Sequence, residues 1–201
     1  MYSSRTASFN GNLKHNTHMR KILILFFVIG FYFSAEAQFG VRAGLSSSNF
    51  SNTNFNANVG IHVGGYYTIL ASEFFSVEPG IQFSQKGFET IDPPTSNEVD
   101  ERLNYVEVPV LVRLNFIPAV NVFAGPQFGA LVSRKRTEEG NNQTSTEPVK
   151  GYDISGVVGL QALLPRGFNL QVSYDLGLTS VNYFGQDAKN QALKLSIAYD
   201  F

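Results

Sequence analysis

The sequence predicts an all-β protein: an eight-stranded antiparallel up-and-down transmembrane β-barrel, preceded by a cleaved signal peptide. Three observations support this prediction, namely alternating strands, an export signal, and an alternation of short and long connections. The alternation is clearest at the carboxyl end, where apolar and polar or small residues take turns over Leu193–Phe201. Period-2 alternation indicates a strand with one apolar face and one polar face.

The export signal lies near the amino terminus. A basic Met19-Arg20-Lys21 precedes an apolar run over 22–33 and a cleavage motif, Ala35-Glu36-Ala37. These are the parts of a secretory signal peptide, and the run is shorter than the roughly 20 residues of a spanning helix. We therefore expect a signal peptide at 19–37 and a mature barrel domain at 38–201. Residues 1–18 are polar and aperiodic, so we expect a non-native extension there, with Met19 as the true start.

Alternating segments fill the rest of the chain. In order, the eight predicted strands are Phe39–Ser47, Val59–Leu70, Phe74–Phe88, Leu103–Phe116, Val120–Ser133, Tyr152–Leu163, Phe168–Leu176 and Leu193–Phe201. Within the fourth, valines at every even position from Val106 to Val112 oppose Glu107, Pro109 and other residues. We expect the apolar face of each strand to look outward, toward lipid.

The connections are short and long in turn. Short ones cover 71–73, 117–119 and 164–167, whereas long polar ones cover 48–58, 89–102, 134–151 and 179–190. Outer-membrane barrels have short periplasmic turns and long extracellular loops. The second and third long loops carry mixed charges, and a protein or glycan partner would bind on such loops. Their charged residues include Glu98, Asp100, Glu101, Arg134, Lys135, Arg136, Glu138 and Glu139.

A soluble lipocalin-like barrel is the alternative fold, with the apolar face inward around a ligand. The polar faces argue against it, because they are rich in Gly, Ser, Asn and Gln rather than in the charged and bulky residues that cover a soluble surface. The 18 Phe and 9 Tyr, with charged residues at 15%, also suit a wall that faces hydrocarbon.

Composition excludes several other classes. The chain has no Cys, which removes disulfides, thiolate metal sites and a lipoprotein anchor. A formal net charge of −1 gives no basic patch for nucleic acid. We expect no cofactor and no metal. The partners that we expect are outer-membrane lipid and, during insertion, the barrel assembly machinery, for which the terminal aromatics Tyr199 and Phe201 would be the assembly signal.

The inward faces carry charges. Strand parity predicts a lumen charge network of Arg42, Glu78, Glu107, Arg113, Asp175 and Lys194. An eight-stranded barrel is just wide enough for its interior side chains to fill it. Because unpaired buried charges are costly, we expect a neutralised structural plug. The functional alternative is a gate or a proton path.

Catalytic residues are scarce. His62 is the one histidine of the mature chain, and its parity directs it into the lumen, away from lipid. Without a second histidine or a positioned base, no residue forms a convincing nucleophile site. We therefore expect no enzyme. A lipid-modifying enzyme stays as the second alternative, behind a narrow channel with porin-like transport.

Several of these segments also resemble the PorT-like outer-membrane β-barrel family of the Bacteroidetes. The likeness lies in 39–45, in Tyr105-Val106-Glu107-Val108-Pro109, in Gly125-Pro126, in 174–178 and in the terminal Tyr199-Asp200-Phe201. It implies a porin-family barrel with a structural, loop-binding or secretion-associated role. Pro109 cannot donate to the strand ladder, so we expect a bulge or break there.

Overall fold

A computed structural model describes residues 37–51, 56–70, 72–92, 97–138, 141–144, 151–180 and 188–201. The predicted extension at 1–18 and all but the last residue of the predicted signal peptide lie outside these residues. Helical structure in the described part is limited to the 3-10 turn Pro165–Gly167. No helix there is long and apolar enough to cross a membrane.

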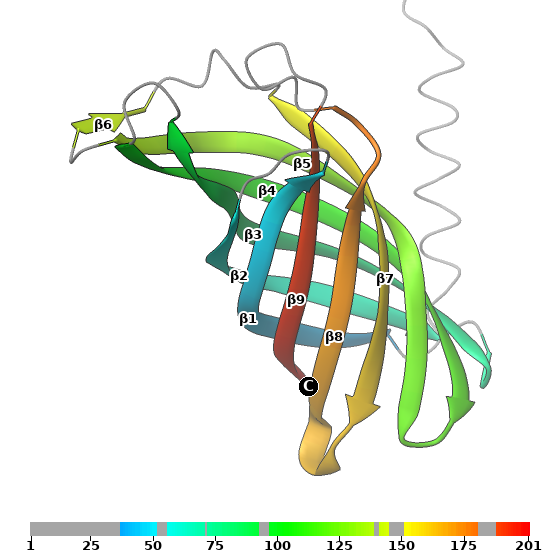
Figure 1. The fold of residues 1–201 in the computed structure, drawn as a ribbon. Coiled ribbons are helices and arrows are strands. Elements are labelled where there is room, and N and C mark those ends of the chain that lie inside the picture. The colour runs from blue at the N-terminus through cyan, green and yellow to red at the C-terminus, as the bar shows by residue number, and fades with distance from the viewer. Residues whose placement is uncertain are drawn as a thin grey trace, which may run out of the picture. The chain divides into compact units, whose positions relative to one another are not determined.

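Eight antiparallel strands form a closed barrel (Figure 1). Each pairs with its neighbour along the chain, and pairing of the first with the last closes the sheet. The predicted eight-stranded antiparallel barrel is confirmed. The strands are β1 Ala37–Ser51, β2 Asn56–Leu70, β3 Phe75–Asp92, β4 Asn97–Ile117, β5 Val120–Glu138, β7 Tyr152–Leu163, β8 Phe168–Gly177 and β9 Lys189–Asp200. A ninth strand, β6 (Asn141–Gln143), pairs only with the end of β5.

The apolar face of each strand looks outward, as predicted. In β9, Leu195 and Ile197 are 51% and 61% exposed, whereas Ser196 between them is 4% exposed. The valines of β4 have the same orientation, and Tyr105, Glu107 and Leu111 are buried inside. A wall of exposed aliphatic side chains around a polar interior is stable only in contact with hydrocarbon.

The strands extend further than predicted at the end where the connections are long. The β3–β4 hairpin pairs up to Asp92 and Asn97, and β4 pairs with β5 up to Val99 and Glu138. The predicted loops 89–102 and 134–151 are therefore wrong over much of their length, because both begin and the first also ends within strands. Backbone pairing continues there because the outward residues no longer face lipid and can be polar.

The predicted irregularity at Pro109 is a break and not a bulge, because the β3–β4 ladder lacks pairs at Val108 and Pro109. The pairs Pro79–Val110 and Gln82–Glu107 keep one register on both sides of Pro109, so β4 has no bulge there. Gly80 lies beside the ring, where a Cβ atom would sit 3.5 Å from Pro109 Cγ. The β4–β5 pair has register shifts at two other places, between Asn104 and Tyr105 and between Leu114 and Ile117.

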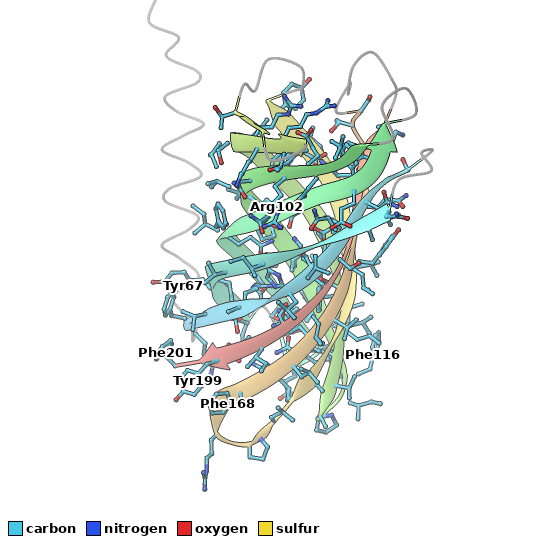
Figure 2. The ribbon with its side chains drawn as sticks, turned by 60° about the vertical axis from the view of Figure 1, so that its left-hand side comes forward. Tyr67, Arg102, Phe116, Phe168, Tyr199 and Phe201 are labelled. Atoms are coloured by element: carbon cyan, nitrogen blue, oxygen red, sulfur yellow. The ribbon has the colours of Figure 1, made fainter. Side chains whose placement is uncertain are left out.

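Aromatic side chains gather on the outside of β1, β2, β8 and β9, near the carboxyl terminus (Figure 2). Phe39 contacts Tyr67 and Phe201 with ring centroids 5.4 and 5.6 Å apart, and Tyr199 contacts both Phe168 and Phe201 at 5.0 Å. Aromatic girdles mark the membrane interfaces of such barrels. The Phe201 amide also donates to the Phe39 carbonyl at 2.9 Å, so the last residue is held against β1.

The outward orientation can be tested with a charge placed in the middle of the apolar wall. Val112 is 43% exposed and central in the outward row of β4. We expect Val112→Arg to lower the free energy of unfolding in lipid vesicles by about 2–4 kcal/mol, the cost of a cation near the bilayer midplane. The control Val112→Met keeps the wall apolar and should have little effect. Equal stability of the Arg and Met variants would contradict a lipid-facing position.

Candidate functional site: the charged lumen

The lumen is lined with charged side chains that balance. Among the described residues, five buried basic and five buried acidic side chains point inward: Arg42, Lys86, Arg113, Arg134 and Lys194, and Glu78, Glu101, Glu107, Asp153 and Asp175. The six predicted lumen charges are all among them. They divide into three groups along the barrel.

The group nearest the short turns is centred on Glu78 in β3. Its carboxylate accepts hydrogen bonds from Arg42 of β1 and Arg113 of β4, one on each oxygen. The two guanidinium groups also lie over aromatic rings, Arg42 over Tyr66 at 4.4 Å and Arg113 over Phe123 at 4.9 Å. One carboxylate thus joins two cations from non-adjacent strands.

The central group is centred on Glu107 in β4. Lys86 Nζ lies 2.7 Å from Glu107 Oε1, and Lys194 Nζ lies 3.0 Å from Glu107 Oε2. Lys194 also pairs with Asp175 at 2.7 Å, and Lys86 with Asp153 at 3.3 Å. These residues come from β3, β4, β7, β8 and β9, so the group connects walls that are not neighbours in the sheet.

Neutral amides complete the central group. Gln82 Nε2 donates to Glu107 at 2.8 Å, and Gln127 Nε2 donates to Asp175 at 3.1 Å. Asn190 Nδ2 donates to Asp153 at 3.0 Å. Additional hydrogen bonds of this kind are what allows buried ion pairs to offset their desolvation.

The third group lies nearer the long connections. Arg134 of β5 donates to both carboxylate oxygens of Glu101 in β4, a bidentate pair. Beside it is an apolar cluster inside the barrel, formed by Phe50, Phe88, Leu103, Tyr105 and Ala188. A second apolar cluster of Leu111, Phe123 and Val157 lies deeper. The interior is therefore not wholly polar, because apolar side chains fill part of the bore.

Four charged members of the lumen were absent from the predicted network. Lys86 and Asp153 have the parity of inward residues in their strands, so the pattern contained the signal for both. Glu101 and Arg134 fell in predicted loops. In addition, Ser133 pairs with Asn104 and Leu131 with Tyr105, which leaves Val132 as an extra residue. This bulge reverses the parity of β5 and turns Arg134 inward.

His62 lies in the lumen, as its parity predicts. Its Nε2 is 2.8 Å from Ser196 Oγ, the geometry of a histidine beside a hydroxyl. However, His62 and Ser196 are 2% and 4% exposed, and among the described residues Nδ1 has no hydrogen-bond partner to orient the ring. A nucleophile needs an oriented base and access for substrate. This pair has neither, and it fits a structural hydrogen bond.

The bore is closed at its centre and open at one end. A cavity of about 470 Å³ enters from the short-turn side, lined by Tyr66, Asn121, Gln161 and Asp200, and reaches Glu78 and Arg113. Beyond them a void of only about 10 Å³ is left between Arg42, His62, Gln127 and Lys194. A void of that size holds at most about one water.

Within the described part of the chain, no group of three or more His, Cys, Asp or Glu residues is placed to hold a metal ion. The carboxylates are instead engaged by Lys and Arg. The acidic and basic side chains of the lumen thus neutralise one another.

The fold and the lumen define an integral β-barrel of the outer membrane, and comparison with known proteins agrees. The family model "Outer membrane protein beta-barrel domain" matches residues 33–183, so the chain belongs to that family and lies in the outer membrane. No curated protein is similar enough in sequence to count as a match.

Solved structures of small outer-membrane barrels are similar in fold. Ail, the attachment invasion locus protein of Yersinia pestis, has a TM-score of 0.52 at 16% identity, and Neisserial surface protein A has 0.57 at 13%. A major outer membrane protein from Thermus thermophilus has 0.51 at 15%. Each match covers 83% of this chain and 100% of the other. At these identities the likeness concerns the fold alone.

The role of Glu78 in joining two cations gives a stability prediction. Glu78→Ala leaves two buried guanidinium groups without their carboxylate, and we expect the free energy of unfolding to fall by about 3–5 kcal/mol. The control is Glu73→Ala, which removes an exposed carboxylate from a turn and should cost less than about 1 kcal/mol. Chemical unfolding in lipid vesicles measures both. Equal small losses would show that the Arg42–Glu78–Arg113 group contributes nothing.

Proposed function

We propose that this protein is a non-enzymatic, non-conducting outer-membrane barrel whose plugged lumen stiffens a scaffold, and that it acts by binding a protein or glycan partner on its extracellular side. The observation that carries the proposal is the contrast between the two ends. The centre is filled by ion pairs and apolar side chains, whereas the paired strands β3, β4 and β5 continue beyond the last outward apolar residues.

The extension of β3–β5 supports a binding role. Strands of 18, 21 and 19 residues are roughly twice the 9–11 that cross a membrane. Their paired ends therefore form a sheet outside the bilayer. A rigid sheet holds its loops with less ordering cost on binding than free loops would.

The proposal has two further parts, which concern secretion and assembly of the barrel. A secretion-associated role is an alternative within this proposal, although the motifs of the PorT-like resemblance describe the barrel alone. We also propose Tyr199 and Phe201 as the assembly signal read by the barrel assembly machinery, supported by the place of both rings in the aromatic cluster at the barrel seam. Transport through a narrow channel is the competing function, favoured by the cavity at the short-turn end.

Conductance separates the plugged barrel from the channel. In a planar lipid bilayer we expect the folded protein to give no discrete current steps, because the central void holds at most about one water. Folded protein can be verified by its resistance to unheated SDS. Reproducible, ion-selective steps from such preparations would overturn the non-conducting assignment.

Site-specific photo-crosslinking in native outer membrane tests the binding role. We expect a photoreactive residue at Ile91 or Glu138, near the ends of β3 and β5, to form a defined adduct with a protein or glycan. The same residue at Phe128, on the apolar wall, should give only lipid adducts. If the two end positions gave no adduct beyond those of Phe128, partner binding by this extension would be excluded.

A further inference from the structure

The outer face of β3, β4 and β5 changes in polarity step by step at the edge of the apolar wall nearer the long connections. Residues directly opposite one another across the three strands form rungs. The first rung is apolar, the second carries amides and a hydroxyl, the third carries cations, and the fourth carries acids. In order, the rungs are Phe83–Val106–Ala130, Gln85–Asn104–Ser133, Gly87–Arg102–Lys135 and Glu89–Asp100–Thr137.

The cation rung sets two like charges side by side. Arg102 and Lys135 are paired across β4 and β5, and both side chains are exposed on the outer face (Figure 2 labels Arg102). Directly opposite residues have Cβ atoms about 4.5–5.5 Å apart, and like charges there destabilise a sheet. An anion bound between the two cations would remove this repulsion.

The protein itself neutralises this rung only in part. Arg102 Nε donates to Asp100 at 3.1 Å, in an ion pair with side chains 45% and 30% exposed. Asp100 also accepts a hydrogen bond from Asn58. Among the described residues, the terminal nitrogens of Arg102 and the Lys135 ammonium have no acidic partner. Those donors are available to a ligand.

The rung lies at the height of lipid headgroups. On β4 the outward apolar row runs from Val106 to Phe116, which at about 3.3 Å per residue and a tilt near 40° is about 25 Å tall. Asn104 then lies about 5 Å and Arg102 about 10 Å above the hydrocarbon edge, and long basic side chains bend back toward that edge. The polar zone of a leaflet is about 5–8 Å thick.

We propose that Arg102 and Lys135 bind a phosphate group of an outer-leaflet lipid, with the amide rung below them facing the polar part of the same molecule. Asn104 donates to Ser133 at 2.8 Å and accepts from Gln85 at 3.2 Å, so this rung is ordered before lipid arrives. The acids one rung above repel a phosphate that lies further out. This site faces lipid and is separate from the proposed partner-binding extension.

Native mass spectrometry of the whole protein tests the site, with bisphosphorylated lipid A as the probe and fully dephosphorylated lipid A as the reference. Wild-type protein should retain the phosphorylated form. Lys135→Gln should weaken retention about fivefold, and Arg102→Gln with Lys135→Gln more strongly, as expected for cations at an anionic surface. The exchanged pair, Arg102→Lys with Lys135→Arg, keeps both charges and should bind like wild type.

Two comparisons make the result decisive. Lys189→Gln removes a cation from β9 whose cross-strand partner is Ser51, and it should leave retention unchanged. Equal losses for Lys135→Gln and Lys189→Gln, or equal retention of both lipid A forms by wild type, would overturn the proposal. So would displacement of lipid A by inorganic phosphate alone, because the site would then take free phosphate. Resistance to unheated SDS shows that each variant is folded.

Discussion

The structure depends on electrostatic neutrality inside a narrow bore. Alternation sends every second residue of a lipid-facing strand inward, and in this chain many of those residues are charged. An isolated charge in such an interior would cost many kilocalories per mole, so each one needs a counter-charge within reach. Five basic and five acidic lumen side chains among the described residues satisfy that need.

Neutrality also constrains the geometry of the barrel. Glu78 on β3 meets Arg42 from β1, and Lys194 on β9 meets Glu107 on β4. These contacts cross the bore, so they form only when the sheet has closed with one register. A shift of one residue in any strand would turn its charges toward lipid. The ion pairs therefore favour one closed arrangement over its alternatives, and the same groups block the centre of the lumen.

The sequence predicted which face of each strand looks outward. It predicted much less about which lumen side chains pair and where the strands end. Alternation in Leu193–Phe201 and around Val106–Val112 was strong enough to predict strand, orientation and lipid contact. It could not show that Lys86 meets Glu107, because that contact depends on the closed sheet. Glu101 and Arg134 were hidden for another reason. Above the membrane the outward face is polar and the inward face mixes apolar residues such as Leu103 with the charged Glu101, so the apolar-outward alternation is lost although pairing continues; on β5 the extra residue Val132 also inverts the parity.

The inner and outer faces of the barrel wall differ in how their charged side chains are arranged. Inside the barrel, charged side chains are paired with one another and need no ligand to neutralise them. Outside, the order of apolar, amide, cationic and acidic rungs on β3–β5 follows the polarity of the bilayer surface. If the proposed lipid contacts anchor it, a plugged barrel would hold its strand extension at a fixed height, as the proposed partner binding requires.

A double-mutant cycle between Glu107 and Lys194 tests the neutrality requirement most directly. Among the ten described lumen charges, Glu107→Gln leaves five bases against four acids and Lys194→Met leaves four against five, whereas the double variant keeps four of each. We expect the double variant to lose less unfolding free energy than the two single losses combined, with a coupling of about 1–3 kcal/mol. Losses that add to within about 0.5 kcal/mol would contradict a mutually neutralised lumen.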